Sequence, residues 1–246
     1  MPIVLRRIER AMERPEEDLA LDEALLRVLD AELERGADPS SGFLRFWESA
    51  RHFVALGVSS KLREDVDAER CAEDGVPVLR RASGGGTVLQ GPGCLNVSLV
   101  VSLDARAGLR DVTRSYRWVL KRAIEALGLA GARRRGISDL ALGERKFAGS
   151  AQKRTPRALL HHSSILWDFD LELVSRYLRE PAKRPDYRGT RAHAEFLMNC
   201  PLDAAEIRRR LATAWGPSAA APAWEPPPLD AYIDERYGRR EWNERF

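Results

Sequence analysis

Apolar residues recur at helical spacing in three parts of the chain. Between residues 15 and 35 the leucines lie three or four positions apart, as on the buried face of a helix. The same spacing predicts helices over residues 112–127 and 204–215. Asp203 can cap the third helix, and Glu206 is positioned to complete a capping box there.

Strands are predicted where apolar and polar residues alternate with a period of two. From Leu95 to Leu103 every second residue is apolar, while Asn96, Ser98 and Ser102 occupy the other face. Further strands are expected over residues 43–47, 53–57, 138–142, 145–149 and 158–167. Of these, 138–142 and 145–149 are expected to form a hairpin. Because helices and strands do not follow in regular βαβ alternation, we expect an α+β fold with a mixed or antiparallel sheet.

A change in composition marks a boundary near residue 216. Proline and alanine dominate residues 216–229, which is typical of a linker. We therefore expect one domain over residues 1–216. Residues 217–246 are expected to form a Pro-rich linker and a short C-terminal segment, with no full accessory domain. The aromatic residues among the last 18 positions favour a short docked helix over a free tail.

Composition narrows the class of protein. Of the 246 residues, 44% are hydrophobic and 31% charged, which is typical of a soluble globular protein. A net charge of +3 gives no case for a nucleic-acid partner, and no apolar stretch approaches the roughly 20 residues of a membrane span. Three cysteines form no disulfide framework, and the first residues lack the apolar core of a signal peptide. A cytoplasmic enzyme is therefore expected.

Basic residues cluster locally despite the small net charge. The runs are Arg133–Arg135, Lys153–Arg154 with Arg157, and Arg208–Arg210. Solvated surface is the simpler interpretation of each run, and contact with a phosphate or an acidic partner is the alternative.

Three consecutive glycines, Gly84–Gly86, lie between strand-like runs. They do not form a Walker A loop, because no Gly-Lys-Ser/Thr follows, and they do not match Gly-x-Gly-x-x-Gly at the start of a helix. Backbone without side chains can turn through positive φ and approach a ligand closely. Arg81, just before the glycines, can pair with a phosphate. A Gly-rich hairpin without a ligand is the alternative.

Lys146 lies in a predicted strand and is followed by Phe147 and Ala148. An ammonium group is costly to bury beside apolar residues unless it meets an anion. One interpretation is that Lys146 holds a carboxylate and stabilises the negative charge of a transition state. The other is a lysine that faces solvent. Together with the glycines, the lysine indicates an enzyme that activates a carboxylic acid as its adenylate.

Two adjacent histidines and one cysteine are further candidates for a metal site or a nucleophile. His161 and His162 are adjacent, so on a strand they point to opposite faces and do not share a metal easily. With four histidines and no Cys/His spacing pattern, no zinc site is expected, and one of the pair is interpreted as a core histidine. Cys94, close to the glycines, is either an acyl-carrying nucleophile or, as we favour, a passive small residue.

Two segments resemble the motifs of a known family. Residues 80–98 are similar to Arg-Arg-x-Ser-Gly-Gly-Gly-Thr/Ala-Val followed by Leu-Asn-x-Ser. Residues 138–152 are similar to Asn-Asp-Leu followed by Lys-Lys-Ile/Phe-Ser-Gly-Ser/Asn-Ala-Gln. Residues 161–166 resemble the family's next strand, and residues 19–26 resemble its first helix. Over about residues 15–215 the chain resembles the lipoate–protein ligases and the related octanoyl and lipoyl transferases.

The resemblance implies a biotin/lipoate ligase catalytic fold, related to class II aminoacyl-tRNA synthetases, with a mixed sheet flanked by helices. It implies that lipoate or octanoate reacts with ATP, assisted by Mg²⁺, to give the acyl-adenylate. The acyl group then passes to a lysine of a lipoyl domain of a 2-oxoacid dehydrogenase or of the glycine-cleavage H protein. A single-domain ligase of this kind is also expected to need a separate accessory subunit, unless the C-terminal segment does part of that work.

The resemblance also assigns site residues by position. Lys146 is the expected catalytic residue, in contact with the acyl carboxylate and the phosphate. Asp139 is expected to help organise Mg²⁺ or ATP. The remaining residues expected to bind substrate or ATP are Arg81, Ser83, Gly84, Gly85, Gly86, Thr87, Val88, Leu89, Asn96, Gly149, Ser150, Ala151 and His162.

Departures from the family pattern keep other functions open. Gln90 replaces a histidine, Gly91 an aspartate, and Ser138 and Cys94 each replace an asparagine. The missing histidine favours an ATP-independent octanoyl or lipoyl transferase. The absence of cysteine from residues 131–139, where transferases of this fold carry their nucleophile, favours the ligase. A non-catalytic lipoate-binding module is a further alternative, whereas a biotin ligase fits the glycine motif less well.

Overall fold

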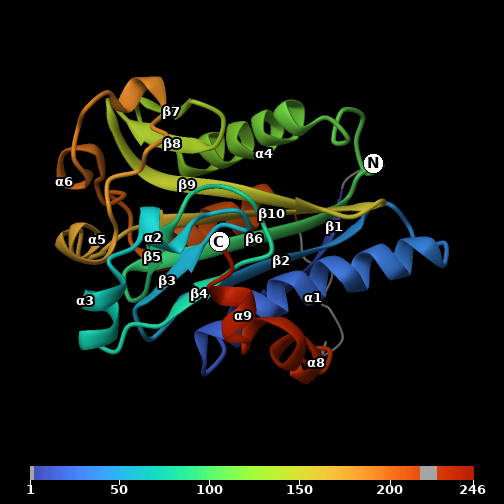
Figure 1. The fold of residues 1–246 in the computed structure, drawn as a ribbon. Coiled ribbons are helices and arrows are strands. Elements are labelled where there is room, and N and C mark those ends of the chain that lie inside the picture. Colours follow the sequence, from blue (N-terminus) through green and yellow to red (C-terminus); the bar gives the residue numbers. More distant parts are fainter. Residues whose placement is uncertain (1–2, 217–225) are drawn as a thin grey trace.

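The computed structural model describes residues 3–216 and 226–246, which form two sheets (Figure 1). The larger sheet has the strand order β1-β2-β6-β10-β9-β8-β7, and the smaller has the order β4-β3-β5. Strands β1 and β2 pair in parallel, as do β3 and β4, whereas the other pairs are antiparallel. Both sheets are therefore mixed, and the predicted α+β fold is confirmed. In chain order the strands are β1 (Val4–Glu9), β2 (Ser41–Trp47), β3 (Phe53–Leu56), β4 (Val78–Arg80), β5 (Val88–Gln90), β6 (Cys94–Ser102), β7 (Ala132–Arg135), β8 (Asp139–Leu142), β9 (Arg145–Arg154) and β10 (Ala158–Leu166).

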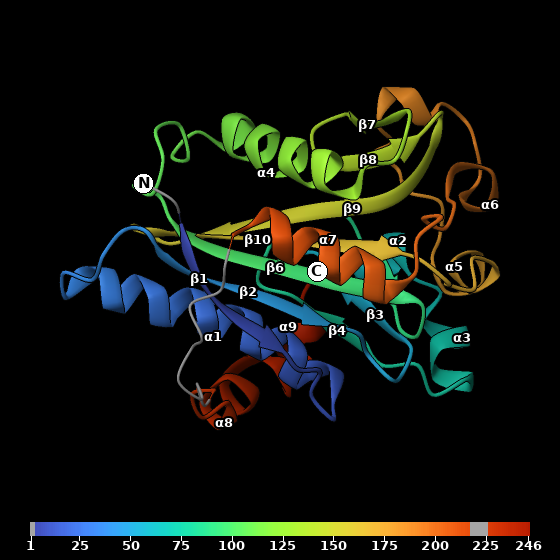
Figure 2. The same cartoon turned by 180° about the vertical axis from the view of Figure 1, so that it is seen from behind.

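Three long helices cover the two faces of the larger sheet. They are α1 (Pro15–Glu34), α4 (Val112–Leu127) and α7 (Ala204–Ala214), each within a residue or two of its predicted bounds. Helices α4 and α7 lie on one face, and α1 lies on the other with the C-terminal helices beside it (Figures 1 and 2). The shorter helices are α2 (Leu62–Asp65), α3 (Ala68–Glu73), α5 (Glu172–Tyr177), α6 (His193–Phe196), α8 (Asp230–Tyr232) and α9 (Arg240–Asn243), with a 3₁₀ turn at Asp186–Arg188 and a π-helical turn at Ile233–Tyr237.

The start of α7 differs from the predicted capping box. The Asp203 side chain accepts a hydrogen bond from the backbone N–H of Glu206, as an N-cap should. The carboxylate of Glu206 does not return to the cap. It pairs instead with Arg209 and Arg210, at 2.7 Å and 2.6 Å. The predicted capping box is therefore wrong, because two guanidinium groups on the next turn compete for the same carboxylate.

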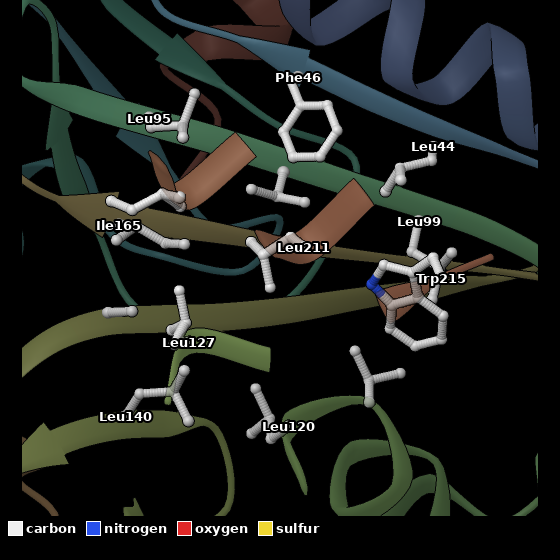
Figure 3. Close-up of a cluster of buried hydrophobic side chains, with 14 of the residues drawn as sticks. Leu44, Phe46, Leu95, Leu99, Leu120, Leu127, Leu140, Ile165, Leu211 and Trp215 are labelled. Carbon is white, nitrogen blue, oxygen red and sulfur yellow. The ribbon is translucent and has the colours of Figure 1, made fainter. Parts of the chain in front are cut away.

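The alternation along β6 explains how the sheet is buried on both faces. Its apolar residues join α4 and α7 in a cluster that includes Leu95, Leu99, Leu120 and Leu211 (Figure 3). All nine residues of β6 are buried, so the polar ones on the α1 side are buried too. Such groups are stable inside a protein only when they are hydrogen-bonded. This polar face forms the floor of the candidate site described below.

The two edge strands of the larger sheet, β1 and β7, were not predicted from the sequence. Strand β7 consists of Ala132 and three arginines, a pattern without apolar alternation that hid it. Arg133 and Arg135 both pair with Glu144, in the β8–β9 turn, so two residues of this basic run have an acidic neighbour in the same chain. Strand β9 is also longer than predicted, because its polar end continues to Arg154.

The C-terminal segment, Leu229–Phe246, packs beside α1 and the smaller sheet, as Figure 1 shows. Tyr237 is 1% exposed and lies in a cluster with Leu79 and Phe53. The expectation of a short docked helix is therefore confirmed. Residues 217–225 of the predicted linker lie outside the described residues, and the domain division at residue 216 stays a prediction. No helix in the described ranges is long and apolar enough to cross a membrane.

His161 and His162 point to opposite faces of β10, as expected. His161 is 1% exposed, packs edge-on against Tyr116, and shares a hydrogen bond of 3.0 Å with the amide of Gln152. Burial, with a smaller contribution from His162, lowers the pKa of His161 from 6.5 to about 3. His161 is therefore a neutral core histidine.

The buried neutral state of His161 makes stability depend on pH. Because the unfolded chain binds a proton near pH 6.5 and the folded chain does not until about pH 3, stability falls as pH drops through this window. Between pH 7 and pH 5 this group should cost the wild type about 2 kcal/mol. We predict that His161→Gln loses that part of the pH dependence, measured by urea unfolding at both pH values. Equal pH dependence in wild type and variant would contradict the assignment.

Candidate functional site

Two rows of side chains cross the α1 side of the larger sheet. Strand register puts Arg45, Ser98, His162 and Ala151 in one row, and Trp47, Asn96, Ser164 and Gly149 in the next. On β9 both rows end in a residue with little or no side chain, Ala151 and Gly149. This end of the polar floor therefore presents nearly bare strand.

A β-bulge directs Lys146 onto this bare strand. In the β8–β9 ladder Leu140 pairs with Ala148 and Ala141 pairs with Lys146, so Phe147 has no partner across the ladder. A bulge of this kind re-aims the neighbouring side chain. A Cβ placed on Gly149 would lie 2.8 Å from the Lys146 Nζ, which shows that the ammonium group lies directly over this glycine.

Asp139 holds the ammonium group in this position. Its Oδ1 is 2.8 Å from the Lys146 Nζ, and its Oδ2 accepts a hydrogen bond of 2.8 Å from the Tyr187 hydroxyl. The Lys146 side chain is 24% exposed and that of Asp139 is 10% exposed. An ammonium has three N–H donors and this carboxylate engages it at one oxygen, so Lys146 can contact Asp139 and a ligand together.

Arg81 shapes the glycine loop. Its Nη2 donates to the carbonyls of Gly84 and Gly86, both at 2.7 Å, and its Nη1 donates to the carbonyl of Ala55 at 2.8 Å. Its Nε donates to the Ser83 hydroxyl at 3.1 Å. Burial lowers the pKa of Arg81 to about 10, which still leaves it charged at neutral pH. The guanidinium expected to pair with a phosphate is directed instead at the loop carbonyls, and this leaves the loop N–H groups for an anion.

The glycine loop and Lys146 meet on β9. Gly85 has φ +86°, and a Cβ there would lie 3.4 Å from the Cβ of Ala151. Gly57 packs directly against the loop, because a Cβ on Gly57 would lie 2.0 Å from the Gly85 carbonyl oxygen. The loop therefore lies over Ala151 while the ammonium lies over Gly149, two residues or about 7 Å away along the same strand face.

A chain of polar contacts links the loop to α1. The Ser83 hydroxyl is 2.6 Å from Nε2 of His162, and Nδ1 of His162 is 3.7 Å from Asp22. Asp22 also accepts from the Ser98 hydroxyl at 2.6 Å and from Arg45 at 2.8 Å. Burial raises the pKa of Asp22, but Arg45 and His162 outweigh it and leave that pKa below its ordinary value. The ionised carboxylate can therefore orient His162 toward Ser83.

A second polar network surrounds Gln90, which stands where the family motif has histidine. Its amide nitrogen donates to Ser164 at 2.6 Å, and its amide oxygen accepts from Asn96 at 2.8 Å and from the Cys94 thiol at 3.2 Å. Burial raises the pKa of Cys94 to about 12. The thiol is fully buried and stays protonated, so the structure agrees with a passive Cys94.

Of the other residues expected at the site, those that follow the glycine loop run into β5, whereas Ser150 lies on the other face of the sheet. The Thr87 hydroxyl donates to Asp65 at 2.5 Å, and Val88 and Leu89 lie in β5. The side chain of Ser150 does not join the candidate site. It contacts Ser163 at 2.8 Å on the opposite face of the sheet, because strand residues alternate between faces.

Asp139 does not fit a protein-held Mg²⁺. The described ranges contain no group of three or more His, Cys, Asp or Glu residues arranged to hold a metal. Both oxygens of Asp139 are already engaged, by Lys146 and by Tyr187. Mg²⁺ that arrives with ATP is commonly held by one or two carboxylates together with phosphates and waters, so these contacts do not test such a role. Asp139 is the ion-pair partner of Lys146, and its expected part in organising Mg²⁺ or ATP stays a prediction.

Two residues of the candidate site, Asp22 and Tyr187, were not predicted from the sequence. Asp22 could have been found, since Asp18, Asp22, Leu25 and Leu29 share one face of the predicted helix and all are buried. A carboxylate at a buried helical position predicts a charged partner, which is Arg45. Tyr187 lies in a 3₁₀ turn 48 residues beyond Asp139, and no spacing pattern points to it.

A groove of about 970 Å³ lies away from this site. It is formed by β1, β2 and α7, and includes Leu5, Leu44, Trp167 and Arg208. Leu44 faces the cluster beneath α4 and α7, whereas its neighbour Arg45 belongs to the polar floor on the α1 side. The groove and the candidate site are therefore on opposite faces of the sheet.

Several known proteins are similar to this chain in sequence. A putative lipoate-protein ligase A of Aeropyrum pernix is 32% identical over 162 residues, 66% of this chain and 57% of the relative. Lipoate-protein ligase A subunit 1 of Thermoplasma acidophilum is 30% identical over 178 residues, 68% of this chain and 63% of the relative. An octanoyltransferase of Clostridioides difficile is 26% identical, over 70% of this chain and 68% of the relative. The matches thus span less than two thirds of the first two relatives.

Solved structures share the fold over nearly the whole chain. The bi-partite lipoate protein ligase of T. acidophilum has a TM-score of 0.81 at 24% identity, over 98% of this chain and 96% of that chain. A lipoate-protein ligase A bound with ATP has a TM-score of 0.79 at 24% identity, over 99% of both chains. A putative lipoate protein ligase of T. acidophilum with bound lipoic acid has a TM-score of 0.78 at 23% identity, over the full length of both.

The family model for the lipoyl protein ligase A/B catalytic domain matches residues 14–213. These residues include the glycine loop, Lys146, Asp139 and the polar floor between them. The chain therefore belongs to the lipoyl protein ligase A/B family.

Proposed function

We propose that the chain activates lipoate or octanoate with ATP as the acyl-adenylate, and transfers the acyl group to a lysine of a partner protein. The observation that carries this proposal is the meeting of Lys146 with the glycine loop on one face of β9. A fixed cation beside side-chain-free backbone suits a ligand that carries both a carboxylate and phosphates.

Each step places negative charge near Lys146. In the first step the carboxylate of the acid attacks the α-phosphorus of ATP, and pyrophosphate leaves. In the second step the acceptor amine attacks the acyl carbonyl, AMP leaves, and the amine loses a proton to solvent. The ammonium of Lys146 can stabilise the charge on the phosphoryl and acyl oxygens in both steps. Asp139 and Tyr187 orient the ammonium and, in this proposal, do not touch the substrate.

The relatives support the choice of substrates. Solved neighbours hold ATP in one case and lipoic acid in another, and a third is described together with its E2 lipoyl domain. We infer that lipoyl domains of 2-oxoacid dehydrogenases, or the glycine-cleavage H protein, supply the acceptor lysine. The bi-partite neighbour is consistent with a separate accessory subunit.

A second candidate function is an ATP-independent octanoyl or lipoyl transferase. The octanoyltransferase relative favours it. A transferase of this kind needs a nucleophile, and Cys94 is buried with a raised pKa. The ligase therefore agrees better with the chemistry of the described residues.

One pair of assays separates the two functions. A ligase catalyses ATP–pyrophosphate exchange that depends on lipoate or octanoate, and mass spectrometry then detects the acylated lipoyl domain. A transferase acylates the same domain from octanoyl-carrier protein without ATP. Exchange dependent on the free acid supports the proposal, and ATP-independent transfer without exchange rejects it in favour of the transferase.

Lys146→Ala should abolish acyl transfer without unfolding the chain. Loss of one charge-stabilising contact costs on the order of 10²–10³-fold in rate. The measurement is the rate of acylation of a lipoyl domain, with folding checked by circular dichroism. Lys153→Ala, on the same strand and also partly buried, is the matched control and should keep wild-type activity. Activity of Lys146→Ala within a few-fold of wild type would reject its role.

Gly57→Ala should displace the glycine loop. The new methyl group would lie 2.0 Å from the Gly85 carbonyl oxygen, so the backbone must move. A displacement of about 1 Å can cost on the order of 10²-fold in rate. Acylation rates and calorimetric binding of ATP check this, with the exposed Ser59→Ala as control. Unchanged ATP affinity in a folded Gly57→Ala variant would show that the loop does not bind the nucleotide.

Cys94→Ser should leave acyl transfer within about threefold of wild type. The thiol is buried and protonated, so it offers no thiolate to attack an acyl group. Transfer is measured with ATP and free acid, and separately with octanoyl-carrier protein. Loss of transfer from octanoyl-carrier protein in Cys94→Ser would instead identify this cysteine as the nucleophile of a transferase.

A further inference from the structure

The C-terminal segment, Leu229–Phe246, binds the backbone of the residue just before Arg81. The N–H of Arg80 donates to Oδ1 of Asn243 at 2.8 Å, and its carbonyl accepts from the indole N–H of Trp242 at 2.7 Å. Strand β4 is an edge of the smaller sheet, with β3 on one side. The two side chains therefore satisfy backbone groups that another strand would otherwise satisfy.

The Arg80 side chain ties this segment to the support of the glycine loop. Its Nε donates to the Trp242 carbonyl at 3.1 Å, and its Nη2 donates to the Arg245 carbonyl at 2.6 Å. Its Nη1 donates to the carbonyl of Gly57 at 2.8 Å. Arg80 is fully buried. One guanidinium thus joins the C-terminal segment to Gly57, the residue against which the Gly85 carbonyl rests.

A separate set of contacts anchors the segment to α1. Arg236 pairs with the carboxylate of Glu23 at 2.5 Å, and the Tyr237 hydroxyl donates to the same carboxylate at 2.7 Å. Glu23 is 2% exposed and follows Asp22, the partner of His162. The segment therefore has two attachments, one to α1 and one to Arg80. They are joined within the segment, since the Asn243 amide donates to the Tyr237 carbonyl at 2.9 Å, but different side chains make the bonds to α1 and to the Arg80 backbone.

We propose that residues 229–246 form a brace that holds the glycine loop in its ligand-binding conformation, with Trp242 and Asn243 as positioning residues. The brace acts on the loop by two routes. It fixes the Arg80 backbone, and hence the neighbouring Arg81, which bonds the Gly84 and Gly86 carbonyls. Through the Arg80 guanidinium it also fixes Gly57. The consequence for catalysis rests on the proposed function, whereas the mechanical role of the brace does not.

Hydrogen exchange tests the mechanical role in the full-length protein. The double variant Trp242→Phe, Asn243→Ala removes both bonds to the Arg80 backbone and keeps an aromatic ring at position 242. Amide exchange over residues 81–89, read at the hydrogen-bonded N–H of Arg81 and at Val88 and Leu89 in β5, should accelerate by about tenfold or more, while exchange in the centre of β10 stays unchanged. Tyr237→Phe, which breaks a bond to α1 alone, is the matched control and should leave the loop protected.

The exchange experiment can overturn the brace on its own. Unchanged protection of residues 81–89 in the double variant would reject the proposal. Equal acceleration in Tyr237→Phe would also reject it, because the segment would then contribute general stability and not loop geometry. Neither readout requires enzymatic activity, so a failure of the proposed function is distinguishable from a failure of the brace.

Kinetics tests the consequence for the site. In the double variant the KM for ATP should rise by about tenfold, with kcat within about threefold of wild type, because a loosened loop binds the nucleotide less often in its productive form. Tyr237→Phe should keep both constants within about twofold. Unchanged KM in a double variant that shows faster loop exchange would reject the catalytic consequence. Absence of turnover in wild type would reject the proposed function and leave the exchange result standing.

Discussion

One irregularity in one strand decides where the cation of the candidate site points. The β8–β9 ladder skips Phe147, and Lys146 therefore turns over Gly149 to meet Asp139. The ammonium is then held near the face that the glycine loop covers. Without the skip, alternation along β9 would give Lys146 the same face as Ala148, which packs in the core beneath α4 and α7. The bulge thus converts a residue of the core side into a residue of the site.

Two buried guanidinium groups build the loop that faces this cation. Arg81 gathers carbonyls of the glycine loop, and Arg80 gathers carbonyls from Gly57 and the C-terminal segment. A buried guanidinium is stable when its N–H groups are hydrogen-bonded, so carbonyls around each of them are drawn inward. The arginines of the motif thus shape the backbone of the loop. Under the proposed function they would act on a ligand through that backbone.

Sequence predicted the parts of the fold that follow simple periodicity, and it did not predict the parts set by tertiary contacts. The long helices and the alternating strand β6 were predicted closely, because their buried faces are strongly apolar. Strand β7 was missed because Ala132 and three arginines show no apolar alternation. In the site, motif spacing pointed to Lys146 and the glycines. Three other features depend on tertiary pairing that no local pattern encodes. Arg81 points at the loop carbonyls, Ser150 points to the sheet face opposite the site, and Tyr187 contacts Asp139.

A crystal structure with a non-hydrolysable acyl-sulfamoyl adenosine tests the central claim most directly. The sulfamoyl or acyl oxygen should lie about 2.7–3.2 Å from the Lys146 Nζ, with the nucleotide against the backbone N–H groups of Gly84–Gly86. A ligand found elsewhere, for instance in the groove beside β1 and α7 with Lys146 still engaged by Asp139 alone, would contradict the account.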